Sequence, residues 1–129
     1  MAINDVSISQ AEWQVMKILW EDAPRTLPQI MDALSYTQWS KTTIQTYLSR
    51  LVKKGALKTE RHGKGYLYSP TITELESQLS ESKSFLDKVY DGSVASMLSG
   101  FVKTGNLSQE ELNKLKKLLA EQENRDADS

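Results

Sequence analysis

Hydrophobic residues recur at helical spacing along the first forty residues and predict two helices there. Ser9 and Glu12 have the spacing of a capping box, and the helix that they open carries an apolar side from Trp13 to Trp20. A proline at position 24 ends this pattern, because the residue before a proline disfavours helical geometry. Thr26 and Gln29 repeat the capping signal, which predicts a second and shorter helix after the first.

A third helix is predicted over residues 41–54, with Ser40 as its N-cap and Gly55 as the left-handed residue after its end. Apolar residues at helical spacing predict its buried stripe: Ile44, Leu48, Leu51 and Val52. The other side of this helix carries hydroxyls, an amide and basic groups, but no acid.

Two strand-like runs follow, at 57–62 and 66–69, and the segment Gly63-Lys64-Gly65 joins them as a tight turn. Pro70 ends the second run. Three helices followed by a hairpin are the order of elements in a winged helix-turn-helix, with the glycine-flanked lysine at the tip of the wing.

The chain after Pro70 predicts three further helices, opened by Thr73, Ser93 and Ser108. Many of their apolar side chains have little to cover them: Leu75, Leu79, Leu86, Val89, Tyr90, Met97, Leu98, Phe101, Leu112, Leu115, Leu118 and Leu119. We expect a second copy of the chain to cover them, since symmetric dimers are the commonest assemblies. The alternative is that these helices fold back on the winged helix.

The expected fold is therefore mainly α: a winged helix-turn-helix at 1–70 followed by a helical dimerisation region at 71–122. Residues 123–129 are polar and are expected to form a frayed tail.

Charge is distributed unevenly along a chain of 129 residues whose formal net charge is only −1. Residues 1–70 carry a net charge of +3, whereas residues 71–129 carry −4. Within 41–64 there are seven basic residues and a single acid, Glu60. A local basic stripe matters more to a polyanion than the overall sum, so this segment favours a double-stranded DNA partner. A solvated helix surface is the alternative.

The exposed side of the third helix supplies groups that could contact bases in a major groove: Thr42, Thr43, Gln45 and Thr46. Gln45 can pair with adenine through two hydrogen bonds. Hydroxyl and basic groups suited to phosphate lie on the same helix and on the hairpin: Lys41, Ser49, Arg50, Lys53, Lys54, Lys58, Arg61 and Lys64.

The sequence lacks the residues and motifs of a metal site, a catalytic site, a secretion signal or a membrane span. The sequence has no cysteine and a single histidine, His62, so we expect no metal site and no cofactor. It has no phosphate-binding glycine loop, HExxH or GxSxG pattern, so we expect no enzyme. No secretion signal and no apolar run of membrane-spanning length occur, so we expect a cytoplasmic protein without membrane insertion.

Three segments together resemble the penicillinase repressors, also called the BlaI/MecI family, which has copper-responsive relatives. They are ISQAEWQVM with ILW at 8–20, KTTIQTYLSRLVKKG at 41–55, and KSFLDKVY followed by DGS at 83–93. The resemblance covers nearly the whole chain. It implies a homodimeric, sequence-specific DNA-binding repressor that holds a palindromic operator until a signal arrives.

The resemblance also bears on induction. In the beta-lactam branch a membrane sensor leads to cleavage of the repressor at an Asn-Phe bond in the C-terminal helices. The corresponding bond here joins Gly100 and Phe101, and the asparagine is absent. The copper branch has a cysteine-rich site near its C-terminus, and this chain has no cysteine to form it.

A second hypothesis treats the chain as a dimeric adaptor whose winged helix binds protein without sequence-specific DNA binding. The basic segment at 41–64 argues against it, because a protein-binding helix tends to expose larger apolar residues.

Overall fold

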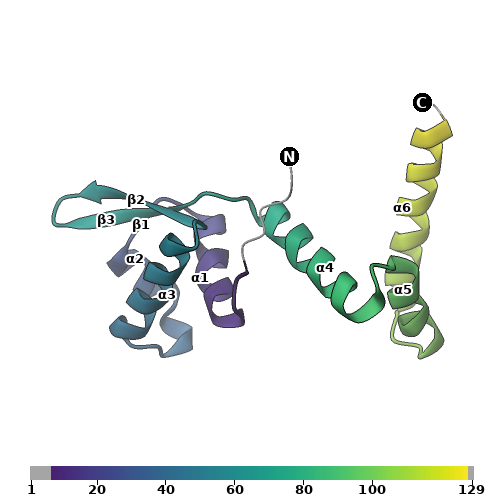
Figure 1. The fold of residues 1–129 in the computed structure, drawn as a ribbon, viewed down its shortest axis with the longest axis horizontal. Coiled ribbons are helices and arrows are strands. Elements are labelled where there is room, and N and C mark those ends of the chain that lie inside the picture. The colour runs from purple at the N-terminus through teal and green to yellow at the C-terminus, as the bar shows by residue number, and fades with distance from the viewer. Residues whose placement is uncertain (1–6, 128–129) are drawn as a thin grey trace. The chain divides into compact units, whose positions relative to one another are not determined.

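A computed structural model describes residues 7–127 of the chain. Over these residues the elements run in the order α1 (Gln10–Glu21), β1 (Arg25–Thr26), α2 (Leu27–Ala33), a 3-10 turn η1 (Ser35–Thr37), α3 (Lys41–Lys53), β2 (Leu57–His62), β3 (Gly65–Pro70), α4 (Glu74–Tyr90), α5 (Val94–Lys103) and α6 (Gln109–Ala127) (Figure 1). Three helices followed by a hairpin confirm the winged-helix prediction.

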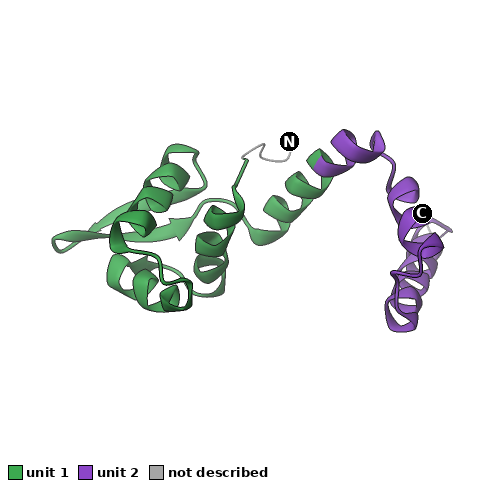
Figure 2. Ribbon diagram, turned by 90° about the horizontal axis from the view of Figure 1, so that it is seen from below, with its two compact units in different colours: residues 1–84 green, residues 85–129 purple. Residues whose placement is uncertain are grey.

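The chain forms two compact units, residues 1–84 and 85–129 (Figure 2). The boundary falls inside α4, fourteen residues beyond the predicted one at 70 and 71. The first turns of α4 belong with the winged helix because Ile72, just before it, and Ser77, within it, are buried. Leu75 and Leu79, which we predicted in the dimerisation region, therefore belong to the first unit.

The predicted caps fix where the helices begin. The Ser9 hydroxyl accepts from the Glu12 amide at 3.1 Å, while the Glu12 carboxylate accepts from the Ser9 amide at 2.8 Å. Thr26 and Gln29 form the same reciprocal pair at the start of α2. Each box satisfies two amides that a helix start would otherwise leave unpaired, so the chain is set into helix at these points.

The core of the first unit forms where α1, α2 and α3 meet. Ile44, Leu48 and Leu51 are each at most 1% exposed, and Val52 at the edge of the stripe is half-buried. Residues of α1, and of α2 with its C-cap, pack in the same core, among them Val15, Met16, Leu19, Ile30 and Leu34. After α3, Gly55 has a φ of +85°, the left-handed conformation in which glycine carries no steric penalty.

The hairpin of β2 and β3 is closed by Gly63, whose φ is +61°. It projects from the helical part of the first unit (Figure 1). A two-residue strand that we did not predict, β1, pairs with β3 and makes a three-stranded antiparallel sheet in the order β1-β3-β2. This pairing ties the root of the wing to the segment between α1 and α2.

The second unit holds the end of α4 together with α5 and α6. None of its described residues is fully buried; Phe85, Phe101, Leu118 and Leu119 are between 42% and 61% exposed. The helix α6 continues to Ala127, which corrects the predicted frayed tail. Side-chain contacts one turn apart, from Gln122 to Arg125 and Asp126, accompany this extension. The last two residues of that tail lie outside the described residues.

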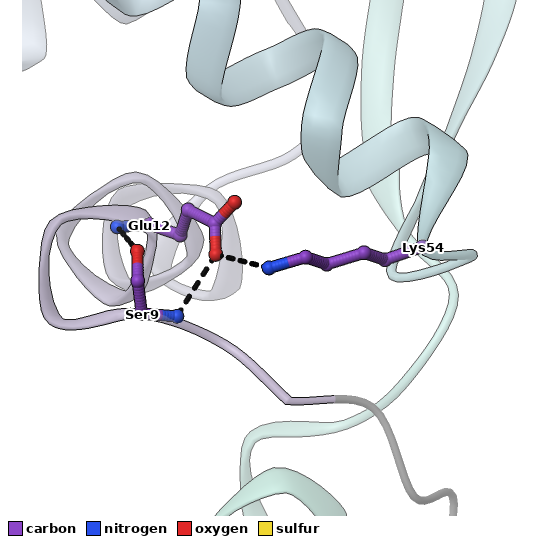
Figure 3. Close-up of polar contacts among 3 residues, drawn as sticks. All are labelled: Ser9, Glu12 and Lys54. Carbon is purple, nitrogen blue, oxygen red and sulfur yellow. Dashed lines mark hydrogen bonds and ion pairs between the residues drawn. The ribbon is translucent and has the colours of Figure 1, made fainter.

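An ion pair between the exposed Lys54 and the buried Glu12 joins the end of α3 to the start of α1. The Lys54 ammonium lies 2.5 Å from Oε1 of Glu12, whose side chain is only 2% exposed (Figure 3). Burial by itself would raise the pKa of Glu12, but the hydrogen bonds from Lys54 and Ser9 outweigh it and lower this pKa below its usual value. The cap residue of α1 is thereby held to the end of α3.

We expect Lys54→Met to destabilise the protein by about 1–3 kcal/mol, because Glu12 then keeps its charge in a buried place without its cationic partner. Urea unfolding measures the change. Lys53→Met is the matched control, since Lys53 is exposed and should shift the unfolding free energy by less than about 0.5 kcal/mol. Equal losses in both variants would contradict the role of the pair.

Acid should remove the contribution of Glu12. Since its pKa is lower in the folded than in the unfolded protein, its stabilisation is present above the ordinary value of 4.5 and is lost as the pH falls through the folded pKa. The Glu12→Gln variant has no ionisable group at this position. The difference in unfolding free energy between wild type and Glu12→Gln should therefore shrink below pH 4.5, as measured by urea unfolding at a series of pH values. A difference constant down to pH 3 would contradict this account.

Candidate nucleic-acid interface

The side of α3 opposite its buried stripe is polar and exposed. At 100° per residue, Thr42, Thr46, Ser49 and Lys53 lie opposite Ile44, Leu48 and Leu51, with Gln45 and Arg50 flanking them. We call these six residues the exposed face of α3: Thr42, Gln45, Thr46, Ser49, Arg50 and Lys53. Because the core fixes the opposite side, this face is held outward.

Local hydrogen bonds orient the threonines near the start of α3. Thr46 donates to the Thr42 carbonyl at 2.9 Å, and Thr43, which is half-buried, accepts from the Ser40 hydroxyl at 3.0 Å. The Thr46 hydroxyl keeps its acceptor capacity. Thr43 lies at the margin of the exposed face, so it is less accessible than the other three predicted base-contacting residues.

The turn before α3 is held by aromatic packing. The Trp39 and Tyr47 rings meet edge to face, with centroids 5.1 Å apart. Gln38 takes the left-handed conformation, with a φ of +61°, and the Thr37 hydroxyl accepts from the Trp39 amide. These contacts fix the backbone immediately ahead of Ser40 and therefore the entry of α3.

The basic residues predicted for phosphate do not all lie on one side. Lys41, Arg50 and Lys53 are exposed on α3, and Lys64 is exposed at the hairpin turn. Lys54 points instead to Glu12, as Figure 3 shows, and its charge is compensated inside the protein. Lys54, directly after Lys53, thus makes a structural contact that spacing along the helix does not reveal.

The register of the hairpin separates its side chains into two faces. Arg61 pairs with Tyr66 and Thr59 with Tyr68, and directly opposed residues in antiparallel strands point to the same side. We call the side with Thr59, Arg61, Tyr66 and Tyr68 the inner face. The outer face, made by the alternate residues, carries Lys58, Glu60, His62 and Leu67. Lys58 and Arg61, both predicted for phosphate, therefore lie on opposite faces.

The inner face is turned toward α3. An open cleft of about 280 Å³ lies between the two elements and is lined by Ser49, Val52, Lys53, Thr59, Tyr66 and Tyr68. Burial raises the pKa of Tyr68, with Tyr66 adding to the effect, so the Tyr68 hydroxyl stays protonated and can donate a hydrogen bond. The residues that line this cleft include a cation and several hydroxyls, but no acid.

Sequence reasoning missed three of these cleft residues: Thr59, Tyr66 and Tyr68. The alternation of Tyr66 and Tyr68 in a strand could have placed both on one face. Which face looks toward α3 depends on the register with β2 and on the buried Leu57, and neither can be read from β3 alone.

Other kinds of site find little support in the described part of the chain. No group of three or more His, Cys, Asp or Glu side chains is placed to hold a metal ion among residues 7–127. None of the helices over the same residues is both long and apolar enough to cross a membrane. The Gly100–Phe101 bond lies inside α5.

Comparisons with known proteins agree with this geometry. The family model described as penicillinase repressor matches residues 8–121. The penicillinase repressor of Bacillus licheniformis is 41% identical over 119 residues, covering 92% of this chain and 93% of that protein. The methicillin resistance regulatory protein MecI of Staphylococcus aureus is 34% identical over 113 residues, covering 87% and 92%.

A solved structure matches the first unit. The DNA-binding domain of the repressor BlaI superposes with a TM-score of 0.51 at 41% sequence identity, covering 58% of this chain and 90% of that one. The family match spans both units and confirms the resemblance drawn from the three sequence segments. The chain belongs to the penicillinase repressor family of DNA-binding transcriptional repressors.

Proposed function

We propose that two copies of this chain bind a palindromic operator and repress the genes beside it, with α3 of each copy in a major groove. The observation that carries this proposal is the pairing of two acid-free surfaces. The exposed face of α3 and the inner face of the hairpin border one cleft; Lys53 lines it, and Arg61 lies on the inner face beside Tyr66. A surface of this kind complements a sugar-phosphate backbone.

The exposed face of α3 supplies the base contacts. The side-chain amide of Gln45 can donate a hydrogen bond to N7 of adenine and accept one from its N6 amino group, which discriminates adenine from the other bases. Thr42 and Thr46 offer hydroxyls and methyl groups to base edges and to the thymine methyl. Thr43 contributes less, because it is half-buried and bonded to Ser40.

Phosphate contacts fall to the residues that remain exposed on these surfaces: Lys41, Ser49, Arg50, Lys53, Arg61 and Lys64. We leave out Lys54, which is paired with Glu12, and Lys58, which lies on the outer face of the hairpin. Lys64 at the hairpin turn can reach the flanking backbone or minor groove, as wing residues near a glycine can approach closely.

Dimerisation is assigned to the second unit, which comprises the end of α4, α5 and α6. Its apolar side chains are exposed or half-buried throughout the described residues, and an apolar surface of this extent is typical of an interface. The match to the penicillinase repressor family covers α5 and α6 as well as the winged helix, to residue 121. A second copy is the proposed partner, because a two-fold symmetric dimer covers the same apolar surface on both chains.

The cytoplasm is the compartment that operator binding requires. Release of the operator through a membrane sensor and cleavage at Gly100–Phe101 stays a prediction from the resemblance. Since this bond lies within a helix, a protease could engage it only after α5 unwinds locally.

The adaptor hypothesis predicts protein partners that stay bound at high salt, whereas DNA binding should weaken steeply as the salt concentration rises.

Gln45→Ala should relax the preference for one base position and weaken binding to the preferred duplex by about 1–3 kcal/mol. The duplex is selected from a random library with the wild-type protein, and affinities are measured by fluorescence anisotropy. Lys64→Ala is the comparison, because the loss of a phosphate contact should weaken binding to all duplexes alike. Unchanged affinity and preference in Gln45→Ala would show that the base contacts lie elsewhere.

Leu119→Asp should break the dimer, because it places a charge in the apolar stripe of α6, where Leu119 is 61% exposed. Sedimentation equilibrium measures the loss of dimer, and operator affinity should fall with it. Asn113→Asp adds the same charge on the polar side of α6 and should leave the dimer intact. A wild-type chain that stays monomeric at concentrations where it binds its operator would contradict the dimeric proposal.

A further inference from the structure

Tyr66 and Arg61 form a pair on the inner face of the hairpin. They are directly opposed in the register, and the Arg61 Cζ atom lies 5.6 Å from the centre of the Tyr66 ring. A guanidinium at this distance over an aromatic face is attracted by the electron density of the ring. The pair is the last side-chain pair of the inner face before the turn, since His62 faces Gly65.

Arg61 has no acid beside it on this face. Glu60, the acid of the basic segment, projects from the outer face, and the ion pairs found among the described residues do not involve Arg61. Its guanidinium is therefore held by an aromatic ring and keeps its full charge. An ion pair with a carboxylate would have compensated that charge and occupied its hydrogen-bond donors.

Tyr66 is 44% exposed, so its ring is not required to fill the core. The same ring lines the cleft between α3 and the hairpin, opposite Lys53. Tyr66 therefore contacts the Arg61 guanidinium and also lines the cleft. A long arginine side chain on a hairpin otherwise samples many rotamers, and the loss of that freedom weakens binding.

We propose that Tyr66 is a positioning residue for DNA binding: its ring holds the Arg61 guanidinium at the rim of this cleft, ready to bind a phosphate of the strand that passes between α3 and the wing. The inference rests on the proposed function and adds a residue that carries no charge itself. Arg61 makes the contact, and Tyr66 acts through it.

The test measures binding of the full-length chain to the library-selected duplex at several potassium chloride concentrations. Tyr66→Leu removes the ring and should weaken binding about two- to fivefold. Arg61→Ala should lower the slope of log affinity against log salt by about one. In the Arg61→Ala background, Tyr66→Leu should cause no further loss, because the group that the ring positions is gone.

Tyr66→Phe separates the ring from the hydroxyl. It should bind within about twofold of wild type, because the aromatic face that holds Arg61 is retained. A loss in Tyr66→Phe equal to that in Tyr66→Leu would overturn the proposal, since the hydroxyl would then be the active group. Lys58→Ala, on the outer face, is the matched control and should keep the wild-type salt slope.

The remaining outcomes are also decisive. If Tyr66→Leu weakened binding equally with and without Arg61, the ring would act independently and the proposal would be wrong. Tyr66→Ile, which suits a strand, replaces Tyr66→Leu if that variant does not fold by circular dichroism. If the wild type bound the duplex and Tyr66→Leu bound it equally tightly, this inference alone would be overturned. A wild-type chain that bound no duplex would overturn the proposed function as well.

Discussion

Burial of one side of α3 determines what the helix can offer to a partner. Ile44, Leu48 and Leu51 are held in the core by α1 and α2, so the residues opposite them must face outward. The ion pair between Glu12 and Lys54 adds a second restraint at the far end of the same helix. A rotation of α3 about its axis would both expose the apolar stripe and separate Glu12 from Lys54. The direction of the polar face is therefore a consequence of the core.

The wing depends on the same core through a different contact. Leu57 begins β2 as a buried residue, and side chains alternate from there along the strand. That one burial places Thr59 and Arg61 on the side of α3, while the pairing with β3 places Tyr66 and Tyr68 beside them. Helix and wing thus form two walls of one cleft, since both are positioned by the core of the first unit.

Local signals predicted most of the elements, because helix caps and glycine turns act over a few residues. The boxes at Ser9 and Thr26 and the glycine after α3 occur as expected. The features that sequence reasoning missed depend on distant parts of the chain. Glu12 and Lys54 are 42 positions apart, and β1 is too short to show a pattern before it pairs with β3. At the C-terminus, polar composition suggested fraying, but contacts one turn apart accompany a helix to Ala127. The assignment of individual residues to bases, phosphates or the dimer stays a prediction.

The two-sided hairpin has a consequence for how this segment can vary among related sequences. Positions 58, 60 and 62 project away from the cleft, so substitutions that change the charge at these positions should have little effect on DNA binding. Positions 59, 61, 66 and 68 share the cleft side, where an acid would repel a polyanion and a lost ring would free its neighbour. Substitution patterns should therefore alternate with a period of two along the wing.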